Sequence, residues 1–160
     1  DLYDDRADFI MKFKGLNNIS ADDFYCHLYR SRYSYLYNKY FKGGGNLSGD
    51  SYDYQSFPLG EGDLFKAFLS SGSILDINPK NQIGLSARTF EALALNKKLI
   101  TTNKKIVNYD FFNPNNICVV DRESLYVPSD FLEREYTPIR DDVLVKYSST
   151  NWVKEFIAQI

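Results

Sequence analysis

The order of apolar segments along the chain is the feature that most constrains its fold. Short apolar runs alternate with segments whose apolar positions recur at helical spacing. The spacing predicts helices at 5–14, 31–41, 61–69, 86–95, 104–109 and 151–158, and strands at 23–28, 52–59, 73–77, 98–101 and 116–120. Strands that alternate with helices form βαβ units with parallel strands and right-handed crossovers. The sequence therefore predicts an α/β fold, a Rossmann-like parallel sheet with helices on both faces.

Length and composition exclude several classes of protein. A chain of 160 residues fits one domain that can bury a core, and we see no second domain in the pattern. The hydrophobic fraction of 44% is typical of a globular protein rather than a disordered one. The formal net charge of −2 provides no field that would attract nucleic acid, so we expect no nucleic-acid partner.

The N-terminus and the cysteines indicate the cellular compartment. The first residues are acidic where a secretion signal is basic, and no apolar run is long enough to span a bilayer. We expect a cytoplasmic location, with peripheral contact at the inner face of the membrane in a full-length protein. Cys26 and Cys118 lie in strand-like apolar stretches, so we expect both to be buried, reduced thiols. The single histidine, His27, is expected to have a structural role, and no cluster of ligand residues suggests a metal.

A polar loop between a strand and a helix is the strongest candidate for a binding site. The predicted strand 73–77 leads into a loop that contains Pro79 and Gly84, and the next helix begins near Ser86. The first amides of a helix have no intrahelical partner and carry the positive end of its dipole, so they suit a diphosphate. Gly84 would let the backbone come close to such a ligand, and Ser86 could donate its hydroxyl.

Two charged residues follow on the same helix. Glu91 lies roughly 7.5 Å along the axis from Ser86, which is about the span from a diphosphate to the ribose of the same nucleotide. Arg88 precedes Glu91 by three positions and so projects on a similar face. It could contact phosphate or pair with Glu91. The alternative for the whole set is structural, with Ser86 as an N-cap and an exposed ion pair between Arg88 and Glu91.

The segment 84–103, GLSARTFEALALNKKLITTN, resembles the donor-binding segment of GT-B glycosyltransferases. It is most similar to a bacterial group of capsular and lipopolysaccharide biosynthesis. The likeness continues through 108–117, 120–122 and 151–155, and it covers the second half of the chain better than the first. The resemblance implies that residues 1–160 form the C-terminal, nucleotide-sugar-binding lobe of a GT-B fold, without its N-terminal acceptor lobe.

The resemblance also assigns roles to residues of this sequence. The donor phosphates would be bound by Gly84, Leu85 and Ser86, with Arg88 as a further candidate, and the ribose by Glu91. The base would be bound by Phe57, Pro58 and Leu59, and the sugar would face Asn78, Asn81 and Gln82. It implies no metal and no tightly bound cofactor. The nucleotide sugar would be the substrate, and the partners would be the acceptor lobe and a glycan or lipid-linked acceptor.

One departure from the family leaves the mechanism open, and two alternatives remain. Position 83 is Ile where many retaining members carry a second Glu, so neither retention, inversion nor a catalytic residue is assigned. A receiver-like signalling module would use Asp76 with Thr101 or Thr102. A dehydrogenase or epimerase would need a glycine fingerprint after the first strand, which this chain lacks.

Overall fold

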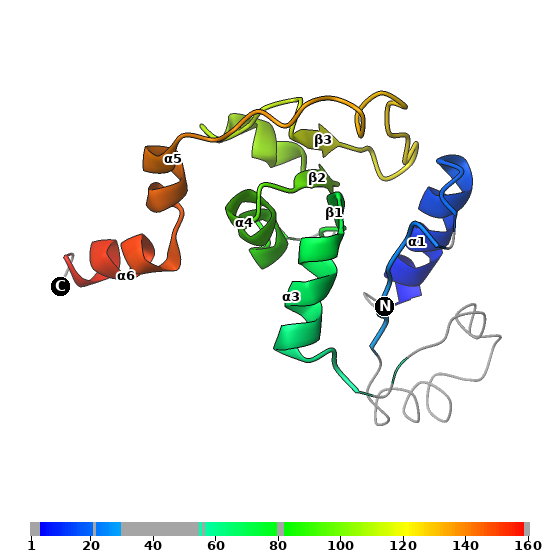
Figure 1. Cartoon of the computed structure of the whole chain (residues 1–160), viewed down its shortest axis with the longest axis horizontal. Coiled ribbons are helices and arrows are strands. Elements are labelled where there is room, and N and C mark those ends of the chain that lie inside the picture. The colour runs from blue at the N-terminus through cyan, green and yellow to red at the C-terminus, as the bar shows by residue number, and fades with distance from the viewer. Residues whose placement is uncertain (1–3, 21, 30–54, 56, 80–81, 159–160) are drawn as a thin grey trace. The chain divides into compact units, whose positions relative to one another are not determined.

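The computed structural model describes residues 4–20, 22–29, 55, 57–79 and 82–158 (Figure 1). They belong to two compact units, Asp1–Ala67 and Phe68–Ile160, and each unit is described by itself. The predicted helix 31–41 and most of the predicted strand 52–59 lie outside the described residues. No helix of the described part combines the length and the apolar character needed to cross a membrane.

The first unit contains helix α1 (Asp4–Leu16), which confirms the predicted helix 5–14. The helix buries Phe9 and Phe13, whose rings stack with their centroids 6.4 Å apart. The backbone leaves the helix at Asn18, which takes a left-handed conformation with φ of 51°. Asn tolerates this conformation better than most residues. Asn18 therefore lets the chain turn away after the helix ends at Leu16.

The predicted strand 23–28 is wrong. Residues 22–28 form a turn and an extended segment without a ladder partner among the described residues, and Tyr29 makes only an isolated parallel bridge to Gln55. A strand requires a neighbour for its backbone N–H and C=O groups, which an apolar run alone does not supply. Cys26 is consequently exposed, against the expectation that it is buried, whereas Cys118 is half-buried. Both are free thiols, as predicted.

The second unit is built on a parallel sheet of three strands, β1 (Ser73–Asp76), β2 (Lys98–Thr101) and β3 (Ile117–Val119), in the order β1-β2-β3. Helix α3 (Glu61–Ser70) begins in the first unit and leads into β1. Helix α4 (Ala87–Ala94) connects β1 to β2 and packs on both strands. The 3₁₀ helix η1 (Lys104–Asn108) connects β2 to β3. The predicted mixed α/β fold with a parallel sheet is confirmed.

The central strand β2 is buried at all four positions. Its register with β1 places Leu99 beside Ile74 and Thr101 beside Asp76, so these four side chains share one face of the sheet. Lys98 lies on the opposite face and is only 7% exposed. A parallel strand buried on both faces explains why this stretch reads as a short apolar run rather than an alternating one.

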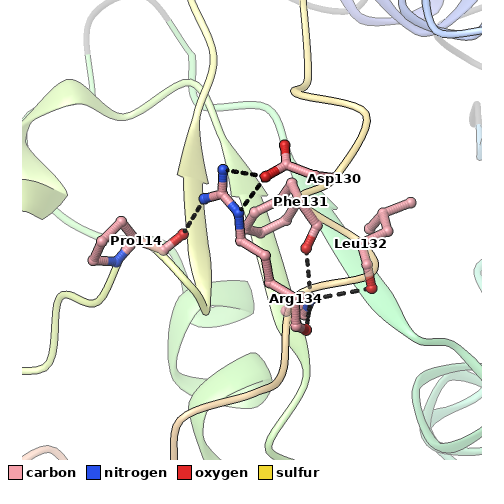
Figure 2. Close-up of polar contacts among 6 residues, drawn as sticks. Pro114, Asp130, Phe131, Leu132 and Arg134 are labelled. Carbon is pink, nitrogen blue, oxygen red and sulfur yellow. Dashed lines mark hydrogen bonds and ion pairs between the residues drawn. The ribbon is translucent and has the colours of Figure 1, made fainter.

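The ammonium of Lys98 is held by backbone carbonyls. It donates to the carbonyls of Phe131 (2.5 Å), Leu132 (3.1 Å) and Arg134. The Arg134 guanidinium in turn contacts the Asp130 carboxylate at 2.8 Å and the Pro114 carbonyl at 3.3 Å, as Figure 2 shows. Burial, and then the charge of Arg134, lowers the pKa of Lys98. These contacts hold the segment 130–134, which consists of turns rather than a helix, against one face of β2.

Two helices end the chain. Helix α5 (Asp141–Lys146) is not among the predicted elements, although its first turn carries Asp141 and Asp142, which suit a helix N-terminus. Helix α6 (Ser149–Ile157) confirms the predicted helix 151–158. Its cap is Ser148, whose hydroxyl accepts from the Asn151 amide at 3.2 Å.

An aromatic cluster connects the end of α5 to α4 and to the loop after η1. Tyr147 packs edge-on against Phe111, with ring centroids 4.9 Å apart, and also stacks on Phe90 of α4. Its hydroxyl donates to Asp110 at 2.7 Å, and Lys146 donates to the other oxygen of the same carboxylate at 2.6 Å. The hydrogen bond from Lys146, and then that from Tyr147, lowers the pKa of Asp110.

Replacing Asn116 by alanine should destabilise the protein. Asn116 is 1% exposed, and its side chain makes two hydrogen bonds to the backbone of Thr137, at 2.7 and 2.8 Å. Their loss removes both bonds between the buried Asn116 side chain and the backbone of Thr137, so the free energy of unfolding should fall by about 1–3 kcal/mol in urea titrations. The exposed neighbour Asn115 is the matched control, and Asn115→Ala should change the free energy of unfolding by no more than about 0.5 kcal/mol. Equal losses in both variants would show that the buried bonds of Asn116 contribute nothing particular to stability.

The Asp110 carboxyl should titrate below its ordinary pKa of 3.8. Because the folded-state pKa is lowered, the contacts of Asp110 stabilise the fold above the unfolded-state pKa and are lost as the pH falls through the folded-state pKa. Carboxyl carbon NMR shifts measure this titration directly. Lys146→Gln should raise the pKa more than Tyr147→Phe, since Lys146 is the larger cause. A titration that neither variant moves would show that the contacts do not persist in solution.

Candidate functional site

A cavity of about 460 Å³ lies where the three strands end. It is lined by residues 78, 79 and 82 after β1, residues 102–105 after β2, and residues 121–123 after β3. Parallel pairing brings the carboxyl ends of all three strands to one edge of the sheet, which is where α/β proteins collect their ligands. The volume is within the range of roughly 300–1,000 Å³ that small-molecule sites occupy.

Hydrogen bonds hold the loops around this cavity together. The Asn78 amide N–H donates to the Thr102 hydroxyl at 2.9 Å, which joins the loops after β1 and β2. The Gly84 carbonyl accepts from the side-chain amides of both Asn103, at 3.1 Å, and Asn78, at 3.4 Å. The Arg122 guanidinium donates to the Asn78 carbonyl and so adds the loop after β3. The cavity wall is therefore fixed by polar contacts between three separate loops.

The charged side chains of the cavity are mixed in sign. Lys104 forms an ion pair with Asp121, whose other carboxylate oxygen accepts from the Glu123 amide at 2.8 Å. The hydrogen bond from Lys104, followed by that from the Glu123 backbone, lowers the pKa of Asp121, which stays ionised at neutral pH. Lys105 is exposed and has no ion-pair partner among the described residues. Among the described residues, the lining carries three cationic and two anionic side chains, an excess of one positive charge.

A buried carboxylate lies beside this cavity at the end of β1. Asp76 is 5% exposed, and its Oδ2 accepts from the Ser86 hydroxyl at 2.8 Å and from the Thr101 hydroxyl at 3.4 Å. Ser86 is the N-cap of α4 by position, yet its hydroxyl makes no capping bond because it is directed to Asp76. The acid-and-hydroxyl pairing on which the receiver-like alternative rests therefore exists. The carboxylate is closed to solvent, however, and does not line the cavity.

The residues expected to bind phosphate surround the start of α4. Gly84 is exposed, and a Cβ added there would meet nothing within 4 Å, so crowding within the protein does not require glycine. The Leu85 carbonyl accepts from the Gln82 side chain at 3.5 Å. The Arg88 guanidinium lies over the ring of Phe68, 5.2 Å from its centroid. Among the described residues, no ion pair links Arg88 to Glu91.

Glu91, expected to bind ribose, is partly buried and lies outside the cavity lining. The buried face of α4 carries Thr89, Ala92 and Leu93. At about 100° per residue, Glu91 is on the face turned away from these residues. Its carboxylate is therefore directed away from the sheet, where it would be reached from outside the unit.

The remaining expected site residues divide between the two units. Asn78 and Gln82 of the sugar-facing set line the cavity, and Asn81 lies outside the described residues. The base-binding set, Phe57, Pro58 and Leu59, belongs to the Asp1–Ala67 unit. There the Phe57 side chain is 80% exposed, and its carbonyl oxygen lies 3.1 Å from Nε2 of His27. This contact gives His27 a structural partner, in agreement with its expected role.

Sequence reasoning missed the cationic part of the site. No function is predicted from the sequence for Lys104, Lys105 or Arg122, nor for the acids Asp121 and Glu123. A usable signal is present, because these residues directly follow the predicted strands 98–101 and 116–120. The carboxyl ends of parallel strands share one edge, so polar residues after successive strands converge.

Comparison with protein-family models, with curated proteins and with solved structures finds no match to this chain. The described residues contain no group of three or more His, Cys, Asp or Glu side chains arranged to hold a metal ion. The function of the chain is therefore inferred from the geometry of the cavity and from the sequence resemblance.

Replacing Ser86 by alanine should lower stability. The hydroxyl makes a charge-assisted hydrogen bond of 2.8 Å to the buried Asp76 carboxylate. Its removal should lower the free energy of unfolding by about 1.5–3 kcal/mol in urea titrations. Ser124, which is exposed, provides the control, and Ser124→Ala should have little effect. A neutral Ser86→Ala variant would mean that the hydroxyl is not committed to Asp76 and is available to a ligand.

Proposed function

We propose that this chain is the donor-binding lobe of a GT-B-type glycosyltransferase with a Rossmann-like fold, and that it binds a nucleoside-diphosphate sugar at the carboxyl edge of its sheet. The observation that carries the proposal is the cavity at this edge. It is lined by Asn78 and Gln82, which the sequence places toward the sugar, together with lysine and arginine side chains. The resemblance of segment 84–103 to the GT-B donor segment supports the same site.

The electrostatics of this edge suit a diphosphate. The N-terminus of α4 offers backbone amides without intrahelical partners and the positive end of the helix dipole. Gly84 adjoins the cavity, because its carbonyl is bonded to both Asn78 and Asn103. A diphosphate beside Gly84, Leu85 and Ser86 would therefore lie next to the cavity, and the attached sugar would enter it.

The other parts of the donor would be bound outside the cavity. Glu91, directed away from the sheet, would accept hydrogen bonds from the ribose hydroxyls. Arg88 would turn from Phe68 toward the phosphates when a donor binds. No metal or tightly bound cofactor is needed for these contacts.

The lobe would contribute to catalysis by stabilising the leaving group. As the glycosidic bond to the donor phosphate breaks, negative charge develops on the diphosphate, and fixed amide dipoles and cations stabilise it without reorganising. An acceptor lobe would supply the glycan or lipid-linked acceptor, and closure of the two lobes would exclude water. The described chain alone would bind donor and transfer nothing. We place this reaction in the cytoplasm, at the inner face of the membrane.

Thermal unfolding with a panel of ligands tests the proposal. The panel contains UDP, GDP, CMP, ADP, NAD and acetyl phosphate. A ligand that binds only the folded state stabilises it by about 2.7 kcal/mol at a hundredfold excess over its dissociation constant. One nucleoside diphosphate should raise the melting temperature selectively. A selective response to NAD would support a dehydrogenase instead, and covalent modification of Asp76 by acetyl phosphate would support the receiver alternative.

A Glu91→Gln variant makes the test specific to the ribose. It should lower the affinity for the selected nucleoside diphosphate by about tenfold, because it removes a charged hydrogen-bond acceptor. The affinity for the 2′,3′-dideoxy analogue should not change. Glu133→Gln, on an exposed residue remote from α4 in sequence, is the control. Failure of all nucleotides to bind at millimolar concentrations would refute the proposed function. An unchanged affinity in Glu91→Gln would refute only the ribose assignment.

A further inference from the structure

We propose that the cavity is an oxyanion site for the sugar-bearing end of the ligand, in which Lys105 is the principal contact and Arg122 provides a fixed second charge. This inference rests on the proposed function, because it identifies the part of the donor that the cavity takes. It concerns residues of the loops after β2 and β3, to which the sequence resemblance assigns no role.

The Lys105 side chain is available to a ligand in this cavity. Its backbone N–H donates to the Asn103 side chain at 3.0 Å, and this bond caps η1 and fixes the start of the turn. Its side chain is exposed and lines the cavity. Lys104, the preceding residue, is committed to Asp121. An anion entering the cavity would therefore meet the Lys105 ammonium without having to break an ion pair.

Arg122 contributes charge from a fixed position. Its guanidinium donates to the Asn78 carbonyl, which holds it against the loop after β1. The positive charge of this guanidinium acts on an anion in the cavity whatever other contacts the side chain makes. Asp121 is paired with Lys104, so among the described lining residues Lys105 and Arg122 outweigh the other acid, Glu123.

Asn78 indicates that the ligand also carries hydroxyl groups. Its Nδ2 faces the Gly84 carbonyl, an acceptor only, and this fixes the orientation of the amide. The Oδ1 atom is buried without a donor from the described residues, in a residue that is 5% exposed and lines the cavity. A buried carbonyl oxygen without a donor is unfavourable, so a ligand hydroxyl placed here would be favoured.

An oxyanion next to hydroxyl groups is the chemistry of a sugar phosphate or a sugar acid. In a nucleotide sugar, the oxyanion could be the phosphate attached to the anomeric carbon or a carboxylate of a uronic acid. Both would be recognised by Lys105 and Arg122 through charge-assisted hydrogen bonds. Probes without a nucleotide base separate these two sources.

The test is an NMR titration of the whole chain with inorganic pyrophosphate, glucose 1-phosphate, glucuronate and neutral glucose. We expect shifts of the amides of 102–105 and 121–123 with at least one anion and none with glucose. Lys105→Gln should lower the affinity for that anion by about 10- to 100-fold, which is the loss expected for one charge-assisted hydrogen bond. Lys105→Arg should retain most of the affinity. Lys154→Gln, on exposed α6, is the matched control and should bind as the unaltered chain does.

The outcomes separate this inference from the proposed function. Lys105-dependent binding of pyrophosphate and glucose 1-phosphate would assign the site to phosphate, and Lys105-dependent binding of glucuronate alone would assign it to a sugar carboxylate. If nucleotides bind but Lys105→Gln leaves every anion unaffected, the cavity assignment is wrong and the donor-lobe proposal stands. If anions bind through Lys105 and no nucleotide binds, the cavity assignment stands and the donor-lobe proposal is wrong. Failure of all anions to bind at millimolar levels would overturn the inference.

Discussion

The parallel pairing of β2 with both of its neighbours is the constraint on which the rest of this unit depends. It places the carboxyl ends of β1, β2 and β3 at one edge, so that three loops far apart in sequence meet there. Parallel strands need crossovers, and α4 and η1 supply them. The cavity and its charges are a consequence of this arrangement.

The polar groups at this edge have unequal freedom. Asp76, Ser86 and Thr101 are joined in a buried network that fixes the start of α4 against the strand ends. A hydroxyl directed to a buried carboxylate is costly to redirect, because the acid would lose its partner. The Ser86 hydroxyl is therefore better explained as part of the scaffold, while the backbone amides of α4 and the Lys105 side chain remain for a ligand.

The sequence predicted best where short-range rules apply. The helices of α1, α4 and α6 and the strands β1 to β3 follow from apolar spacing. Asn78 and Gln82, which were predicted to face the sugar, line the cavity, and their contact with a sugar stays a prediction. The prediction at 23–28 was wrong because an apolar run becomes a strand only if another strand pairs with it, which spacing cannot reveal. Lys105 and Arg122 were missed because their convergence depends on strand order, a property of the sheet.

The sequence by itself determined the α/β class, the parallel sheet and the loop before α4 as the region of interest, because periodicity and helix-start signals are encoded over a few residues. Only the tertiary structure decided that the Ser86 hydroxyl bonds to Asp76 and that Arg88 lies over Phe68. It also decided that Lys105 and Arg122 line the same cavity as Asn78. These choices depend on contacts between residues distant in the chain, and such contacts are set by packing and strand order rather than by local spacing.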